Sequence, residues 1–468
     1  MIIPNKQIVL ATSSASEELA QIDLKDLRLN RRCQSLATAL EQQPTEPVPQ
    51  ACEDWAATKA AYRFFDNPKV SPAEILAPHG QRTRERMAAH PLVLAVQDTS
   101  FLNYTHHPQT DELGEIGNKK QAQRGFGMHS TLVLTPAGQP LGLLTQAFFS
   151  RPIGKPTKVT QAIRRLPIKE KESYRWLEAF QETLRLTPPT VQVVTICDRE
   201  ADFYEMFVLA QAQAAQLLVR ASTDRRLAEA KVQHLWDKLE RQAKLGELKV
   251  QILGNQQRAA RQATVSVRAC QVTLPPPWRP QKKKLPVVTL TAILVREIRP
   301  PATLDEPIEW LLLTTSPANQ FAATAQIVGW YCCRWHIEVY HKILKSGCRI
   351  EDSRLQTARR LQNYIALMSV VAWRLLWLTY TSRIAPDQPC THCLTTMEWQ
   401  ALYLRIHQTT TFPKAPPTVH QAIRWIAQLG GFLGRKSDGE PGVTVIWRGW
   451  QRLQDLAAAW EVVVNEPS

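Results

Sequence analysis

Residues 331–347, "YCCRWHIEVYHKILKSG", place polar and apolar side chains at the spacing of an α-helix. At about 100° per residue, four polar side chains fall within an arc of about 60° and Lys342 joins their face. The four are Tyr331, Arg334, Glu338 and Lys345. The opposite face is apolar and is predicted to pack on a core; it carries Trp330, Cys333, Ile337, Tyr340 and Leu344. For this helix alone, a solvated face with an Arg334–Glu338 pair is the simplest interpretation.

The start of the chain has helical patterns up to about residue 77. Ser14 and Glu17 have the spacing of a capping box. Ser71, followed by Pro72 and by Glu74 three residues on, has the composition of a second helix start. We therefore predict an N-terminal helical module over residues 1–77.

From residue 78 the pattern changes to short apolar runs typical of strands. One run, "PLVLAVQDTS", breaks at Asp98, and another, "VQVVTICDRE", ends at Asp198. Between them, residues 130–149 predict a hairpin with its turn at "PAGQ". A helix over 172–186 precedes the second run, and a later strand ends near Arg220. These alternating elements predict an α/β domain over residues 78–372.

Residues 222–308 interrupt this domain with a different pattern of polar and apolar residues. "ATVSVRACQVTL" and "VVTLTAILVREI" alternate with a period of two, as half-buried antiparallel strands do. The loop between them, "PPPWRPQKKKLP", is rich in proline and strongly basic. We predict a β-rich insertion here, and a mainly helical C-terminal region over residues 373–468.

The composition indicates a globular protein with an anionic partner. Of 468 residues, 57 are Lys or Arg and 42 are Asp or Glu, which gives a net charge of +15. Nucleic acid is the commonest anionic partner, and an anionic membrane surface is the weaker alternative. The most apolar run, residues 364–380, is short for a membrane span and carries Arg374, which favours a buried helix.

The cysteines and the chain start indicate a reduced, cytoplasmic protein. Nine cysteines form no regular disulfide framework. Cys390 and Cys393 have the spacing of half a zinc site, but no second half lies nearby, which favours chance spacing. The first residues lack the apolar core of a signal peptide.

Two strand ends with an aspartate and one helix with a glutamate suggest a carboxylate cluster. Strand ends at one sheet edge can bring Asp98 and Asp198 together, and Glu338 could join them from a neighbouring helix. Three carboxylates repel one another unless cations neutralise them, and hard oxygen ligands select Mg²⁺ or Mn²⁺. Two such ions can activate water or a 3′-hydroxyl for attack on a phosphodiester. The alternative is that each aspartate simply forms a turn or caps a helix.

These residues carry a resemblance to a known family. The order Tyr, two residues, Arg, three residues, Glu, six residues, Lys fits Tyr331, Arg334, Glu338 and Lys345. This pattern, with "QDTS", "CDREADFY", "WLLLTTSP" and "LGGFLGRKSDGEPG", resembles the cut-and-paste DDE transposases of the fourth insertion-sequence family. "AAYRFFDNPKVS" resembles the N-terminal end-binding module of the group that contains the transposon five transposase.

The resemblance implies an RNase H-like catalytic core, two Mg²⁺ ions (Mn²⁺ can substitute) and double-stranded DNA as partner. Asp98, Asp198 and Glu338 would hold the metal ions. Transposon-end phosphates would be bound by five side chains: Tyr331, Arg334, Lys345, Lys342 and Arg220. Trp335 and Trp310 would trap a flipped base, which stacking on an aromatic ring can hold. For Trp310, a place in the core is the alternative.

The resemblance also implies a reaction sequence and a homodimer. Water nicks one strand, the freed 3′-hydroxyl forms a hairpin, water reopens it, and the 3′-ends join target DNA. In the C-terminal region, heptad-like spacing could form a dimer seam, and burial within one subunit fits that spacing equally; the residues are Ile446, Trp450, Leu453, Ala457 and Trp460. Two rivals are a nuclease of the same fold that never joins DNA and a non-catalytic protein that occupies transposon ends.

Overall fold

A mixed β-sheet forms the centre of one of two compact units of the chain. The computed structural model describes residues 14–117, 122–151, 166–228, 234–252, 261–277, 285–301, 307–435 and 438–465. One unit, the sheet unit, comprises Pro91–Asp98 and Gly154–Ile337. The other, the helical unit, comprises Met1–His90, Thr99–Ile153 and Glu338–Ser468. Both units are therefore built from segments that are distant in sequence.

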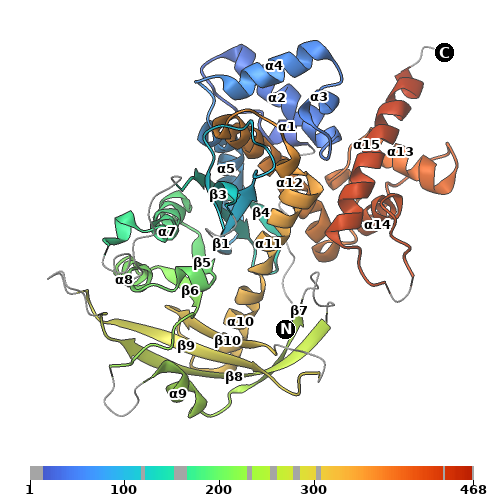
Figure 1. Ribbon diagram of the computed structural model, residues 1–468. Helices are drawn as coiled ribbons and strands as arrows, with labels where there is room; N and C mark the ends of the chain where they lie inside the picture. Colours follow the sequence, from blue (N-terminus) through green and yellow to red (C-terminus); the bar gives the residue numbers. More distant parts are fainter. Residues whose placement is uncertain are drawn as a thin grey trace. The chain divides into compact units, whose positions relative to one another are not determined.

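The sheet unit joins parallel strands on one side to antiparallel strands on the other (Figure 1). Central β5 is parallel to both of its neighbours, β1 and β6. From β6 onward the order β10, β9, β8, β7 is antiparallel. The bounds are β1 Leu92–Asn103, β5 Gln192–Cys197, β6 Gln216–Arg220, β7 Gly246–Ile252, β8 Arg261–Leu274, β9 Val288–Glu297 and β10 Glu309–Thr314.

Helices cover this sheet and bury its apolar side chains. Trp176 and Phe180 of α7 and Phe207 of α8 pack in one cluster with Leu217 of β6 and Leu290 of β9. Burial of such large side chains is the main favourable term for this unit. The helices of the sheet unit are α7 Tyr174–Leu186, α8 Tyr204–Ala212, α9 Leu235–Glu240 and α10 Phe321–Cys332, with the short η2 Ile168–Glu170 and η3 Arg199–Ala201.

The predicted β-rich insertion is confirmed where the structure describes it. Strands β8 and β9 pair antiparallel from Val265↔Glu297 to Leu274↔Val288, and β7 pairs with β8. The basic part of the predicted loop, residues 278–284, lies outside the described residues. The insertion therefore extends the sheet.

In the helical unit, a hairpin is surrounded by helices. β3 (Arg124–Leu134) and β4 (Pro140–Phe149) pair antiparallel, and the amide of Thr135 donates to the carbonyl of Gln139 at 2.9 Å. The predicted turn is thus confirmed. Short β2 (Gly114–Glu115) pairs with β3 on the other side. Gly138 has φ +88°, a left-handed conformation that glycine adopts at little cost in this turn.

The N-terminal helices begin where the capping residues predict. The Ser14 hydroxyl accepts the amide of Glu17, and that of Ser71 accepts the amide of Glu74. The helix that Ser71 caps is α5. It continues past residue 77, the expected end of the module, to Ala88. The helices here are α1 Ala15–Glu18, α2 Leu27–Gln42, α3 Val48–Ala51, α4 Trp55–Asp66 and α5 Pro72–Ala88.

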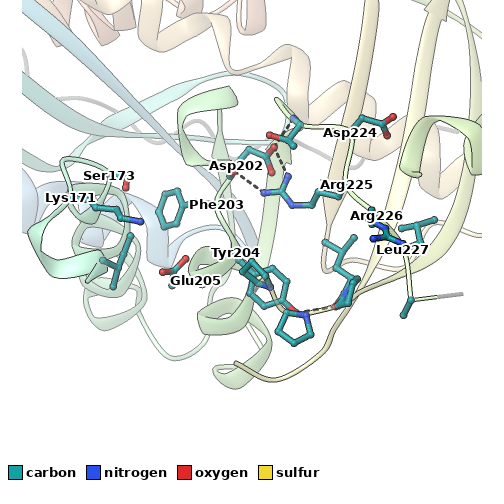
Figure 2. Close-up of a pocket in the computed structure, with 17 residues that line it drawn as sticks. Lys171, Ser173, Asp202, Phe203, Tyr204, Glu205, Asp224, Arg225, Arg226 and Leu227 are labelled. Atoms are coloured by element: carbon teal, nitrogen blue, oxygen red, sulfur yellow. Dashed lines mark hydrogen bonds and ion pairs between the residues drawn. The ribbon is translucent and has the colours of Figure 1, made fainter. Parts of the chain in front are cut away.

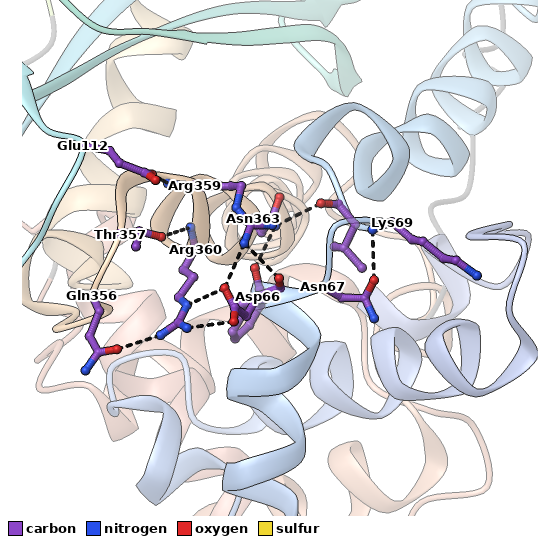
Figure 3. Close-up of polar contacts among 11 residues, drawn as sticks. Asp66, Asn67, Lys69, Glu112, Gln356, Thr357, Arg359, Arg360 and Asn363 are labelled. Atoms are coloured by element: carbon purple, nitrogen blue, oxygen red, sulfur yellow. Dashed lines mark hydrogen bonds and ion pairs between the residues drawn. The ribbon is translucent and has the colours of Figure 1, made fainter.

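These N-terminal helices are joined to the long helix α12 (Ala358–Ile384) by polar contacts (Figure 3). The Asp66 carboxylate at the end of α4 accepts from Arg359 Nη2 at 2.8 Å and Arg360 Nε at 2.9 Å. The buried Asn363 amide donates to the carbonyls of Phe65 at 3.0 Å and Val70 at 3.2 Å. Because the last carbonyls of a helix lack intrahelical partners, these bonds satisfy the end of α4.

Helix α12 contains the apolar run predicted to be a buried helix, and this prediction is confirmed. It is long and apolar enough to cross a membrane, but its most apolar window is wholly buried inside the protein. Arg374 is buried too and forms an ion pair with Glu41 of α2. The Arg374 guanidinium also donates to the carbonyl of Cys393 at 3.2 Å and lies over the Trp450 ring. A buried charge is tolerated because these partners surround it.

The C-terminal helix α15 (Val443–Asn465) buries its heptad-like positions within the same chain. Ile446, Trp450, Leu453 and Ala457 are buried, and the Trp450 indole donates to the carbonyl of Glu41 at 3.2 Å. The spacing therefore reflects burial within one subunit for these four residues. The remaining helices of this unit are α13 Thr396–His407 and α14 Val419–Leu429, with the short η5 Ile350–Asp352 and η6 Cys390–His392.

All nine cysteines are free thiols. Cys390 and Cys393 are buried at η6, and the Cys393 thiol donates to the carbonyl of Cys390 at 3.3 Å. Burial raises the pKa of both thiols to about 12. Thiols with such pKa values stay protonated and are poor metal ligands.

Candidate active site

The register of two parallel strands places Asp98 and Asp198 at equivalent positions. Leu92 of β1 faces Gln192 of β5 and Val96 faces Ile196, an offset of 100 residues. Asp98 and Asp198 each lie two residues beyond the last of these pairs and share that offset. Neighbouring strands lie about 4.8 Å apart and side chains alternate between faces. The two carboxylates therefore lie on the same side of adjacent strands, as predicted.

The strand that carries Asp98 does not end there, which corrects one expectation. β1 continues to Asn103, so Asp98 lies inside the strand. The apolar run ends at Asp98, but the strand itself continues. On its other side β1 pairs with β3, so pairing extends the strand beyond the buried segment. Asp198 does follow β5 directly, and it caps η3 by accepting the amide of Glu200 at 2.8 Å.

The negative charge of Asp98 perturbs the ionisation of Asp198. Burial, together with the negative charge of Asp98, raises the pKa of Asp198 to about 6. The nearby Arg334 guanidinium opposes this shift only weakly. A buried acid whose pKa is raised by a neighbouring carboxylate marks a site that a cation would stabilise.

The raised pKa of Asp198 predicts how the free energy of unfolding of the metal-free protein depends on pH. A carboxyl group whose pKa is higher in the folded state than in the unfolded state costs stability as pH rises from about 4 to about 6. Asparagine removes that cost and still caps η3. Asp198→Asn should therefore be more stable than wild type at pH 8 in EDTA, by up to about 3 kcal/mol, with a much smaller gain at pH 4. Urea unfolding at both pH values measures this.

The matched control for this prediction is Asp237→Asn, which removes an exposed carboxylate of the same unit. It should change stability by no more than about 0.5 kcal/mol at either pH. An equal gain for Asp198→Asn at pH 4 and pH 8 would show that the substitution acts through packing instead of charge.

Several predicted DNA-binding residues of the sheet unit contact one another near the aspartates. The Tyr331 hydroxyl is bonded to both Arg220 and Arg334, and its ring lies 5.3 Å from that of Trp310. The Arg334 guanidinium lies 5.6 Å from the Trp335 ring centroid. Burial is the main cause that lowers the pKa of Arg220 and raises the pKa of Tyr331. The cluster is thus a cationic and aromatic patch near Asp198.

The predicted single helix over 331–347 is interrupted, which corrects its geometry. α10 ends at Cys332, and α11 (Trp335–Lys342) follows after a tight turn. In that turn the amide of Arg334 donates to the carbonyl of Tyr331 at 3.0 Å, a tighter three-residue step. The chain then widens into the π-helix η4 (Ile343–Gly347), which contains Lys345.

The interruption changes the exposed face. The five apolar positions predicted to pack on a core are buried, as expected. Tyr331 and Arg334 are buried as well, at 4% and 9% exposure, so they do not present a solvated face. The expected 60° arc holds only for an unbroken helix. Trp310, at 9% exposure, has the burial of a core residue, and its role in base trapping stays a prediction.

Three predicted site residues, Glu338, Lys342 and Lys345, belong to the helical unit. Lys342 is exposed. The Lys345 ammonium donates to the carbonyl of Phe101 at 2.6 Å and lies 3.5 Å from the Glu351 carboxylate. Glu351 in turn accepts the amide of Asn103 at 2.7 Å. Sequence alone does not point to Glu351, because nothing in local spacing links it to Lys345.

The donor chemistry fits a divalent cation. Asp98 and Asp198 are a pair of hard oxygen donors, and burial with the charge of Asp98 raises the pKa of Asp198. Within the residues that the structure describes, no three His, Cys, Asp or Glu side chains form a ready group for a metal ion. The third predicted ligand, Glu338, lies in the other unit.

Three family models match the chain in sequence order. A model described as "Transposase DNA-binding" matches residues 11–70. "Transposase DDE domain" matches 177–374, a range that includes Asp198 and Glu338 but begins after Asp98. "Transposase Tn5 dimerisation domain" matches 370–462. The chain belongs to the DDE transposases, and the DDE domain gives its α/β core the RNase H-like fold. Within that class, its three domains are those of a Tn5-type transposase.

One solved structure is a weak match. It is a cryo-EM structure of a piggyBac transposase synaptic complex with hairpin DNA, at 8% identity and a TM-score of 0.28. The match covers 63% of this chain and spans about half of that chain, 48%. A TM-score this low carries no argument about fold or function.

Proposed function

We propose that the protein is a metal-dependent DNA transposase that excises an insertion sequence and joins its ends to target DNA. One observation carries this proposal: the register of β1 and β5 sets Asp98 beside Asp198 in a chain with transposase DNA-binding, DDE and dimerisation domains. A protein that only occupied DNA ends would have no use for two acids that repel each other.

In this proposal Asp98, Asp198 and Glu338 would hold two Mg²⁺ ions. When bound, these ions supply activation of the attacking oxygen and stabilisation of the leaving oxygen at a phosphodiester. Arg220, Tyr331 and Arg334 contact one another beside Asp198, and we assign them to the transposon-end phosphates. Their mutual contacts fix their orientation before DNA arrives, which lowers the cost of binding.

The proposed reaction has four chemical steps: strand nicking by water, hairpin formation by the freed 3′-hydroxyl, hydrolysis of the hairpin, and joining to target DNA. Two copies of the chain would act together on paired ends, in the cytoplasm with the nucleoid. Lys342 and Lys345 add positive charge from the helical unit, and Lys345 would exchange its contact with Glu351 for a phosphate.

The experiment that tests the proposed function is strand joining. Purified protein, precut end DNA of the host element and a target plasmid should give joined products in Mg²⁺. Joined products would rule out the end-occupying binder and the simple nuclease together. End binding and cleavage without joining would instead support the nuclease.

Trp335→Ala should impair the hairpin step more than the first nick. Its indole, packed against the Arg334 guanidinium, offers a half-exposed surface on which an extruded base can stack. Such stacking contributes about 1–3 kcal/mol per base. Nicked and hairpin products separated on a denaturing gel measure both steps. Trp236→Ala, at a half-exposed tryptophan of the insertion, is the control. A normal hairpin yield in Trp335→Ala would remove this residue from base trapping.

A further inference from the structure

A buried carboxylate connects the segment after Asp198 to the segment after Arg220 (Figure 2). Asp202 follows η3, the short helix that Asp198 caps, and its side chain is wholly buried. Its Oδ2 accepts four hydrogen bonds: from Ser222 N at 2.7 Å, Ser222 Oγ at 3.0 Å, Thr223 N at 3.2 Å and Arg225 Nη1 at 2.8 Å. We call these contacts the Asp202 tether.

The tether joins two loops that lie far apart in sequence. Its first end lies four residues after Asp198, and its second begins two residues after Arg220. Arg225 adds a second bond, from Nη2 to the carbonyl of Asp202 at 2.8 Å. Asp202 is therefore held through both its side chain and its backbone.

Charge-assisted hydrogen bonds are the main contacts of the tether. They go to a buried carboxylate, and such bonds are among the strongest in proteins, so they can fix a loop. The Arg225 guanidinium also lies 5.6 Å from the Phe207 ring centroid. The tether borders a cavity of about 960 Å³, whose lining includes Asp202, Thr223 and Arg225 (Figure 2).

Two alternatives fit Asp202 less well. A metal ligand needs a carboxylate whose negative charge is not already neutralised. The Arg225 guanidinium lies 2.8 Å from Oδ2 of Asp202 and neutralises this carboxylate. As a simple turn former it would bond its own neighbours, whereas its partners lie 20 or more residues away.

We propose that Asp202 is a positioning residue: it holds Asp198 and Arg220 at the places where metal and transposon-end phosphate must meet. The inference rests on the proposed function and deepens it. A displacement of about 1 Å at a reacting centre can cost about 10²-fold in rate, so a loosened tether should slow chemistry without abolishing DNA binding.

The test compares full-length wild type with Asp202→Asn, which keeps the size and removes the charge. We expect single-turnover nicking of end DNA to fall about 10²-fold and half-saturating Mg²⁺ to rise, with Kd for end DNA within twofold. Arg225→Gln should act in the same direction, and the double variant should be no slower than Asp202→Asn. Asp224→Asn is the matched control, because its carboxylate borders the same cavity but bonds the amide of Trp236 instead.

Three results would overturn the inference. Unchanged nicking and Mg²⁺ dependence in Asp202→Asn, with wild type active, would refute the positioning role alone. The tether would only maintain the fold if the variant lost nicking rate, DNA affinity and melting temperature together. If wild type binds end DNA but never nicks it, the proposed function fails and the inference falls with it.

Discussion

Asp98→Asn, Asp198→Asn and Glu338→Gln should each abolish DNA cleavage and leave transposon-end binding largely intact. Each amide keeps the shape of the side chain but removes the negative charge that a divalent cation needs. Metal-ion catalysis supplies several kcal/mol of transition-state stabilisation, so the loss should be at least about 10³-fold. Cleavage of labelled end DNA and a gel-shift titration of the same preparation measure the two activities.

Glu200→Gln serves as the control for these variants, since it removes an exposed carboxylate two residues from Asp198. It should cleave end DNA at close to the wild-type rate. If Asp98→Asn, Asp198→Asn or Glu338→Gln cut DNA as wild type does, that residue would have no place among the metal ligands.

Arg374→Met should destabilise the protein by about 3–5 kcal/mol, the largest stability effect we expect. The substitution leaves the Glu41 carboxylate buried without its ion-pair partner, and breaking one side of a buried pair costs this much. It also removes the guanidinium from the Trp450 ring and from the carbonyl of Cys393. Urea unfolding monitored by tryptophan fluorescence measures the change.

The companion variant is the double substitution Glu41→Gln with Arg374→Met. It removes both charges and should recover part of the loss, because an uncharged pair carries a smaller desolvation cost. Arg405→Met, at a site remote from this pair in sequence, is the control and should lie within about 0.5 kcal/mol of wild type. Equal stability of Arg374→Met and wild type would mean that the pair contributes nothing.

Much of the fold can be predicted from sequence because its signals are local. An apolar run that ends at Asp198 predicts a strand edge, and β5 ends there. Ser71, Pro72 and Glu74 predict a helix start through capping, which depends only on neighbours. Alternation with a period of two predicts the antiparallel strands β8 and β9. In these places local propensity and tertiary structure agree.

The remainder depends on contacts between residues distant in sequence. An unbroken helix over 331–347 satisfies every local rule, yet burial of Tyr331 and Arg334 within the sheet unit accompanies a tight turn at 333–334. In the sequence, Lys345 is simply a cation on a helix face, and its contacts with Phe101 and Glu351 appear only in the structure. Phe101 lies 244 residues from Lys345, and no spacing rule joins residues so far apart along the chain.

The Asp202 tether shows the same limit. "CDREADFY" carries the resemblance through Asp198, whereas the second aspartate of the motif has partners 20 to 23 residues later. Its role becomes visible only when the register of β5 and β6 brings the two strand ends together.

Cleavage of the host element's own terminal DNA by purified protein decides whether this chain is a transposase that cuts through its carboxylates. The reaction is run with Mg²⁺, with EDTA and with the Glu338→Gln variant. We predict double-strand breaks with hairpin ends in Mg²⁺, and none with EDTA or the variant. Binding of the same DNA without any cutting in Mg²⁺ would contradict the assignment, and would make the cluster around Tyr331 and Arg334 a DNA-binding surface only.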